Sequence, residues 1–363
     1  MKKFSLKLLA YLFGVTVLLF LTIALLIKIR PEYFLGVERI DHMRCNYKYS
    51  MIKSKTNFKN IIMGDSKGAV NINPLILGKN WGNLSIEGSN FFEAYISLKY
   101  FLKLNKVDTL LMCYGVQNNF EGISSHINIK TIPFEFNSFE ELLDLEKIEN
   151  KEGYMISDAY NFSTTCFGKK IISDKDYLLY KQYLRRLRYI HFPLSYRETF
   201  IDGLFNSLLG FHNKRQNDLT IEYMKSHLGQ YQLSLTPNYS YPNMILDLEN
   251  RFKPNLVNFS YLDSIVQITN KNKIFTCIIL GPINKGTNNK FLGSVYQQSL
   301  SSFINKTKSQ YPSLIFLDSN PICIPDSCFG DQGGHTNPRG TTFFSNVTKS
   351  KLKLIQIENK LSH

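Results

Sequence analysis

Short apolar runs alternate with amphipathic segments in two separated parts of the chain, residues 58–120 and 270–350. The first part contains three predicted strands, at 59–63, 80–86 and 107–114. A helix is predicted between the second and third strands, because Ser89 is a suitable N-cap and apolar residues follow it at helical spacing. Strands joined by a crossover helix are typical of a parallel sheet, so the pattern predicts an α/β fold.

The same alternation returns near the carboxyl end of the chain. The predicted elements are a buried strand at 273–281, an amphipathic helix at 291–311, a strand at 314–317 and a closing helix at 341–357. Each of the two strands is a short apolar run, and the helices have their apolar residues at a spacing of three or four. These elements extend the predicted sheet.

Residues 121–265 lack this alternation, and we interpret them as a long, largely helical insertion. Helices are predicted within it at 139–148 and 174–189. The second helix carries a group of basic residues, namely Lys181, Arg185, Arg186 and Arg188. A solvated basic face is the simpler interpretation of this group. Contact with lipid phosphates or with an anionic acceptor is the alternative.

The amino-terminal segment has a different pattern. An uncharged run extends from Leu8 to Ile27, with basic residues before and after it. As a helix, a run of this length reaches across the core of a bilayer. We predict a single-pass membrane anchor at residues 1–30, because no small-x-small cleavage site is evident. A cleaved signal peptide is the alternative.

The predicted domain organisation follows from these patterns. Residues 31–57 are a juxtamembrane connector, and residues 58–363 form the α/β domain with an insertion at about 121–265. The lysines before the anchor favour a cytoplasmic amino terminus. The α/β domain is then expected on the extracytoplasmic side of the inner, or cytoplasmic, membrane.

Ser66 follows the first predicted strand on a turn that Gly64 permits. A serine at the carboxyl end of such a strand lies in the crevice where open α/β sheets bind ligands. A plain Gly-Asp-Ser turn explains the same residues equally well. The other end of the chain adds Asp331 and His335, and a serine nucleophile needs an imidazole base that a carboxylate orients.

Together, the Gly64-Asp65-Ser66 turn and the Asp331 to His335 stretch resemble the SGNH hydrolase superfamily. The nearer likeness is to membrane-anchored proteins of cell-envelope acyl transfer, such as those of alginate O-acetylation and of D-alanine transfer to teichoic acid. The resemblance implies a flavodoxin-like three-layer sandwich. It also implies Ser66 as nucleophile, His335 as base and Asp331 as acid, with no cofactor and no metal.

The residues depart from the family pattern in two places. Three residues separate Asp331 from His335, whereas the family motif has two, so Asp326 remains an alternative acid. The family's oxyanion-hole positions fall on Ser66, Gly88 and either Gln117 or Asn118, with glutamine where asparagine is expected. Asp65 is expected to stabilise the turn, and Lys67 to be an exposed turn residue rather than a contributor of positive potential to the site.

The composition of the chain indicates which class of binding partner to expect. The net charge of +14 favours anionic partners such as a membrane surface or an acidic glycan. No nucleic-acid-binding motif accompanies the charge, so nucleic acid is not expected as a partner. Cys113 and Cys277 lie in apolar runs and are predicted to be buried thiols, and a disulfide between Cys323 and Cys328 is one hypothesis for an oxidising compartment. The remaining histidines show no metal-ligand spacing.

The leading functional hypothesis is an envelope O-acyltransferase or esterase that works through an acyl-serine intermediate on Ser66. A multi-spanning membrane acyltransferase is the expected deliverer of acyl groups, and a hydroxyl of a cell-surface polysaccharide, lipopolysaccharide or teichoic-type polymer is the expected acceptor. The altered motifs support a second hypothesis, a catalytically degenerate SGNH fold that binds glycan or scaffolds an export or modification complex. Hydrolytic removal of acyl groups is a third.

Overall fold

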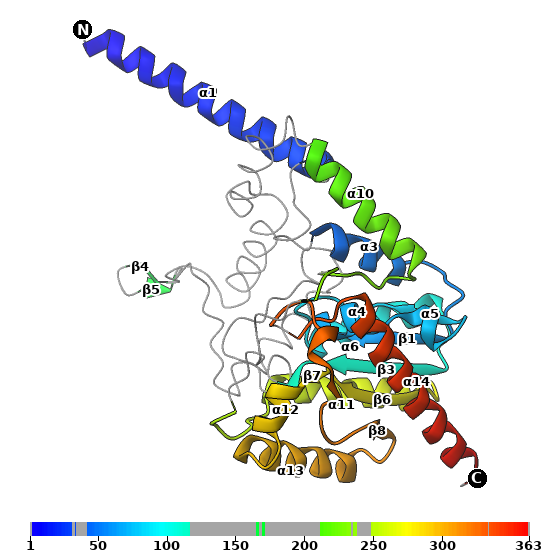
Figure 1. Cartoon of the computed structure of the whole chain (residues 1–363). Coiled ribbons are helices and arrows are strands. Elements are labelled where there is room, and N and C mark those ends of the chain that lie inside the picture. The colour runs from blue at the N-terminus through cyan, green and yellow to red at the C-terminus, as the bar shows by residue number, and fades with distance from the viewer. Residues whose placement is uncertain are drawn as a thin grey trace. The chain divides into compact units, whose positions relative to one another are not determined.

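The computed structural model contains a parallel sheet of five strands, drawn as arrows in Figure 1. Its strands are β1 (Asn60–Gly64), β2 (Trp81–Asn83), β3 (Thr109–Tyr114), β6 (Phe275–Leu280) and β8 (Leu314–Phe316). Their order across the sheet is β2-β1-β3-β6-β8, and every neighbouring pair is parallel. The predicted α/β fold and the five predicted strands are confirmed.

The structure describes residues 2–30, 33, 42–116, 165–166, 169–170, 211–233, 235–237, 248–332 and 334–361. The helices predicted at 139–148 and 174–189, with their basic residues, lie outside these ranges, as do Gln117 and Asn118. Two compact units divide the chain, one of residues 1–44 and 163–222 and the other of residues 45–162 and 223–363.

Helices cover both faces of the sheet because successive residues of each strand point to opposite sides. Ile61 and Met63 of β1 belong to one apolar core, whereas Ile62 between them belongs to the other. The first core is completed by α6 (Phe91–Leu104), α11 (Leu256–Lys271) and α13 (Val295–Gln310). The second is completed by Ile72, which directly follows α4 (Ser66–Asn71), and by residues of α5 (Pro74–Leu77) and α14 (Pro338–Leu361). The domain therefore has three layers.

The strand order reverses between β1 and β3. From β1 the chain moves to β2 at the sheet edge, and it then returns past β1 to β3, β6 and β8. Counted along the chain, this is the order 2-1-3-4-5, a common doubly wound arrangement. Ligands of such sheets bind at the carboxyl ends of the strands beside the reversal. β1 ends there at Gly64, and only Asp65 separates the strand from Ser66.

Several element boundaries differ from the sequence predictions. Asn90 rather than Ser89 caps α6, through a capping box with Glu93. The helix predicted at 291–311 is α13, which begins later, at Val295, because Gly293 before it has a φ of 77°. The preceding helix α12 (Lys285–Phe291) was not predicted. The predicted connector at 31–57 includes α3 (His42–Ile52), whose Tyr49 and Ile52 are buried in the core.

Further short elements were not predicted. They are α4, α5, the parallel pair β7 (Ile283–Asn284) and β9 (Cys323–Ile324), and the 3-10 helix η5 (Asp326–Cys328). In the insertion the structure describes an antiparallel pair, β4 (Thr165–Cys166) with β5 (Lys169–Lys170), and α10 (Phe211–Ser226). α11 begins at Leu256, so the insertion ends before the predicted residue 265.

The amino-terminal segment forms the predicted helix, α1 (Lys2–Ile29). Many of its apolar side chains are exposed, for example Leu9 at 67% and Phe13 at 72%. Among the helices of the described ranges, none combines the length and the apolar character that a membrane span requires.

We predict that replacing Gly64 destabilises the fold through a clash with β3. Gly64 and Gly78 have nearly equal φ values, 152° and 151°. A Cβ at position 64 would lie 1.8 Å from the backbone oxygen of Cys113, whereas a Cβ at position 78 would meet nothing closer than 3.5 Å. Gly64→Ala should therefore cost more than about 3 kcal/mol of unfolding free energy, and Gly78→Ala about 1–2 kcal/mol. Urea unfolding of both variants measures this, and equal losses would contradict it.

Candidate active site

Ser66 lies on a turn between a buried strand and a short helix. β1 ends at Gly64, and α4 begins at Ser66. Between them, Asp65 caps the helix by accepting a hydrogen bond from the backbone N–H of Lys67 at 2.8 Å. Its other carboxylate oxygen accepts from the backbone N–H of Gly115 at 3.0 Å. Asp65 therefore stabilises the turn, as predicted.

A narrow hairpin carries His335. Phe329 and Thr336 pair as an antiparallel bridge, and the backbone N–H of Gly330 donates to the His335 carbonyl at 2.8 Å. Gly334, with a φ of 80°, adopts the left-handed conformation directly before the histidine. These backbone contacts close the loop at its base, directly beside His335.

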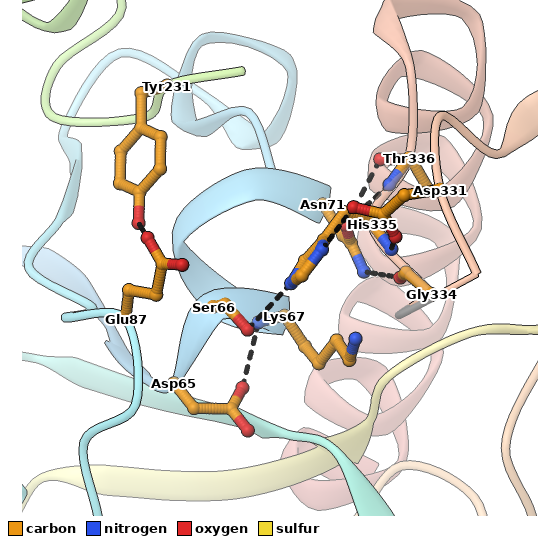
Figure 2. Close-up of polar contacts among 10 residues, drawn as sticks. All are labelled: Asp65, Ser66, Lys67, Asn71, Glu87, Tyr231, Asp331, Gly334, His335 and Thr336. Carbon is orange, nitrogen blue, oxygen red and sulfur yellow. Dashed lines mark hydrogen bonds and ion pairs between the residues drawn. The ribbon is translucent and has the colours of Figure 1, made fainter. Parts of the chain in front are cut away.

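The structure brings Ser66, His335 and Asp331 together, although they come from opposite ends of the domain (Figure 2). The Nε2 atom of His335 lies 2.8 Å from Ser66 Oγ, and Nδ1 lies 2.7 Å from Asp331 Oδ2. The second carboxylate oxygen of Asp331 accepts from the backbone N–H of His335 at 3.1 Å. The longer spacing between acid and base therefore does not prevent their contact.

The hydrogen-bond partners define the tautomer of His335. An ionised Asp331 can only accept hydrogen bonds, so Nδ1 of a neutral imidazole carries the hydrogen that it donates. The lone pair of Nε2 then faces the Ser66 hydroxyl. This is the arrangement that a general base needs in order to take the serine proton.

Opposing effects act on the Asp331 carboxyl, which is 34% exposed. Burial favours its neutral form, but hydrogen bonds from His335, the charge of His335 and the charge of Lys67 favour the ionised form. The balance lowers the pKa of Asp331 below its ordinary value. The acid that orients the imidazole is thus held in its charged state.

Asp326, the alternative acid, has a different partner. It lies on η5, and its Oδ1 accepts from the backbone N–H of Lys285 at 3.2 Å. His335 instead contacts Asp331 through both carboxylate oxygens. Asp331 is therefore the carboxylate that orients the imidazole.

Lys67 is not the exposed turn residue that was predicted. Its exposed fraction is 5%, and its side chain lies over two glycines that follow β3 and β6. A Cβ at Gly115 would lie 3.3 Å from Lys67 Cε, and one at Gly281 would lie 2.8 Å from Lys67 Cγ. Burial lowers the pKa of Lys67, while the charges of Asp65 and Asp331 oppose that shift.

Of the predicted oxyanion-hole residues, the structure describes Ser66 and Gly88, whereas Gln117 and Asn118 lie outside the described ranges. Gly88, with a φ of 68°, lies in a turn that is fastened to the end of β1. The backbone N–H of Ile86 and the hydroxyl of Ser89 both donate to the carbonyl of Gly64, at 2.9 and 2.8 Å. Gly88 is thus held close to the Ser66 turn. Its role as an oxyanion donor stays a prediction, as do those of Gln117 and Asn118.

Sequence reasoning did not find two further polar contacts that Figure 2 draws in the same view as Ser66. The hydroxyl of Tyr231 donates to Glu87 at 3.0 Å. Asn71, the last residue of α4, contacts Gly334 and Thr336 on the two sides of His335. Asn71 lies on the same short helix as Ser66, and this closeness in the sequence is the signal by which Asn71 could have been found.

The cysteines give no cross-link at this site. Cys323 is exposed and Cys328 is buried, and both are free, so the hypothetical disulfide is not formed. Cys113 and Cys277 are buried thiols, as predicted. The described ranges contain no group of three or more acidic, histidine or cysteine side chains placed to hold a metal ion.

Comparison with known proteins gives no relative. No protein-family model matches the chain, and no curated protein matches it. The chemistry of the site is therefore inferred from its geometry.

We predict that Asp331 contributes to stability in a pH-dependent way. Its folded pKa lies below the unfolded value of about 3.9, so its ionisation favours folding above that pH. The contribution is lost as the pH falls through the folded pKa. Wild type should therefore exceed Asp331→Asn in free energy of unfolding at about pH 6, and the difference should shrink below about pH 4. Urea unfolding over this range measures it, and a constant difference would contradict it.

Proposed function

We propose that the chain is an acyl-transfer enzyme, an esterase or an O-acyltransferase, that forms an acyl-serine intermediate on Ser66. The observation that carries the proposal is the pair of short contacts that link Ser66 Oγ, the imidazole of His335 and the Asp331 carboxylate, at 2.8 and 2.7 Å. A hydroxyl with a positioned base and an orienting acid is an activated nucleophile.

In the proposed reaction, Ser66 Oγ attacks the carbonyl carbon of an ester while its proton passes to His335 Nε2. Asp331 stabilises the imidazolium that results. Backbone N–H groups of Ser66 and Gly88 are the proposed donors to the oxyanion. The tetrahedral intermediate collapses to acyl-Ser66 as the imidazolium gives its proton to the leaving alkoxide. Water or an acceptor hydroxyl then attacks the acyl-serine with His335 again as base, and the bond from the acyl carbon to Ser66 Oγ breaks as the imidazolium returns the proton to Oγ.

The arrangement of the sheet supports a flavodoxin-like fold of SGNH type as part of the proposal. Its strand order and the position of Ser66 at the end of β1, beside the reversal, agree with such a fold. The close contact between Asp331 and His335 removes one motivation for the degenerate alternative, namely the widened spacing. We therefore favour a catalytic function.

The substrate and location are a further part of the proposal. The net charge of +14 and the apolar helix α1 fit work close to an anionic membrane surface. The proposed acceptor is a hydroxyl of a cell-surface polymer, and the proposed donor pathway is a multi-spanning membrane acyltransferase. Association through α1 would hold the site on the extracytoplasmic side of the membrane, where both are found.

The catalytic proposal predicts selective labelling of Ser66 by a fluorophosphonate. Wild type should gain one adduct on Ser66, and Ser66→Ala should gain none. Asp331→Asn should label roughly a thousandfold to ten-thousandfold more slowly, because the imidazole loses its orienting acid. Asp326→Asn is the matched control and should change the rate by less than about twofold. Mass spectrometry measures the adduct, and a folded wild type that stays unlabelled would reject the proposal.

The membrane proposal predicts that apolar residues of α1 control sedimentation with membranes. Leu9 and Phe13 are 67% and 72% exposed, so a double substitution to lysine should release the chain into the soluble fraction. The matched control replaces Leu354 and Ile357 of α14, which are 61% and 56% exposed, and should leave sedimentation unchanged. Fractionation of expressing cells measures this. Recovery of the wild-type chain in the soluble fraction would contradict it.

A further inference from the structure

The short helix that carries Ser66 also carries a buried amide. Ser66 is the first residue of α4 and Asn71 is the last. The side chain of Asn71 is fully buried, with an exposed fraction of 0%. A buried amide is stable only where its donors and acceptor find partners. The partners of Asn71 therefore indicate what it holds in place.

These partners lie on both sides of His335. The Nδ2 atom of Asn71 donates to the Gly334 carbonyl at 3.1 Å. Its Oδ1 accepts from the backbone N–H of Thr336 at 3.0 Å and from the Thr336 hydroxyl at 3.2 Å. One planar group thus binds the chain directly before and directly after the candidate base (Figure 2).

Asn71 does not serve the end of its own helix. The carbonyls of Gly68 and Ile72 accept from Nδ2 of Asn83, at 2.8 and 3.0 Å. The Oδ1 atom of Asn83 accepts from Lys48 Nζ and from the backbone N–H of Ser85. Both the donor and the acceptor of the Asn83 amide therefore have partners. With the end of α4 bound by Asn83, the Asn71 side chain directs its hydrogen bonds to the hairpin.

The hairpin needs such a contact because its own bonds only fix its shape. The Phe329–Thr336 bridge and the bond from Gly330 to the His335 carbonyl lie within the hairpin. They do not set its position relative to α4. A longer contact, from the Thr341 hydroxyl to the carbonyl of Val70 at 3.3 Å, ties the start of α14 to α4 beyond the hairpin.

We infer that Asn71 is a positioning residue: it holds the two neighbours of His335 against the nucleophile helix and so sets the distance from the imidazole to Ser66. The inference rests on the proposed function of these two residues. Nucleophile and base are then placed by the same helix, one directly and one through the amide. Because displacement of a reacting group by about 1 Å can cost roughly a hundredfold in rate, a lost amide should be visible in the kinetics.

The first test compares Asn71→Ala with Asn73→Ala in the full chain. Asn73 lies two residues away and caps α5 by accepting from the backbone N–H of Leu75 at 3.0 Å, so its loss removes a nearby side-chain hydrogen bond without touching the hairpin. The measurement is the rate constant for fluorophosphonate labelling of Ser66, at a temperature where circular dichroism shows both variants folded. Asn71→Ala should slow labelling by about 10- to 100-fold, and Asn73→Ala by less than about threefold.

A second readout does not depend on activity. The Nδ1 proton that His335 shares with Asp331 should give a low-field proton resonance in the wild type. Asn71→Ala should shift, broaden or remove this resonance, and Asn73→Ala should keep it. Unchanged resonance and labelling in folded Asn71→Ala would overturn the inference while the proposed function stands. Equal loss in both variants would overturn it too, because general loosening would explain the result.

Two further outcomes are separable. If wild type is not labelled on Ser66, the proposed function fails, and the resonance alone decides whether Asn71 holds the imidazole. If Asn71→Ala does not fold, Asn71→Asp replaces it, since this variant keeps the acceptor for Thr336 and loses the donor to Gly334. Slowing of labelling by about tenfold in Asn71→Asp supports the inference, and a wild-type rate and resonance overturn it.

Discussion

The close packing of the end of β1 against β3 is the constraint on which the site depends. At Gly64 the backbone approaches the Cys113 carbonyl so closely that a Cβ would lie 1.8 Å from its oxygen. Asp65 strengthens the same junction, because one carboxylate oxygen caps α4 and the other binds Gly115 just beyond β3. The sheet itself therefore places Ser66 at the carboxyl ends of the strands, beside the point where the strand order reverses. A nucleophile built on a strand end is held more rigidly than one on a free loop.

His335 reaches the site by a different route, and buried polar side chains bring the two parts together. Its hairpin is closed by local backbone bonds, whereas its position relative to α4 depends on the amide of Asn71. At the end of α4, the amide of Asn83 binds the carbonyls of Gly68 and Ile72. Side-chain amides can bind backbone on either side, which is why asparagines rather than apolar residues join these segments.

The sequence predicted those features whose signals are local. Short apolar runs located the strands, and the residues around Ser66 and His335 marked the nucleophile and base candidates. Features that depend on distant residues were missed. Lys67 is buried because Gly115 and Gly281 leave space for its side chain, and nothing next to Lys67 signals this. Ser89 matched the rules for an N-cap, but its hydroxyl binds the Gly64 carbonyl instead, and Asn90 caps α6.

The buried cation of Lys67 links the turn to the acid of the hairpin. Burying an ammonium group is costly unless nearby charges compensate, and both Asp65 and Asp331 favour its charged form. The relation is reciprocal, because the charge of Lys67 is among the effects that lower the pKa of Asp331. Lys67 thus helps to keep Asp331 ionised, and Asp331 in turn lowers the cost of burying the Lys67 ammonium group. The carboxylates of Asp65 and Asp331 therefore offset part of the cost of burying Lys67 beside Ser66.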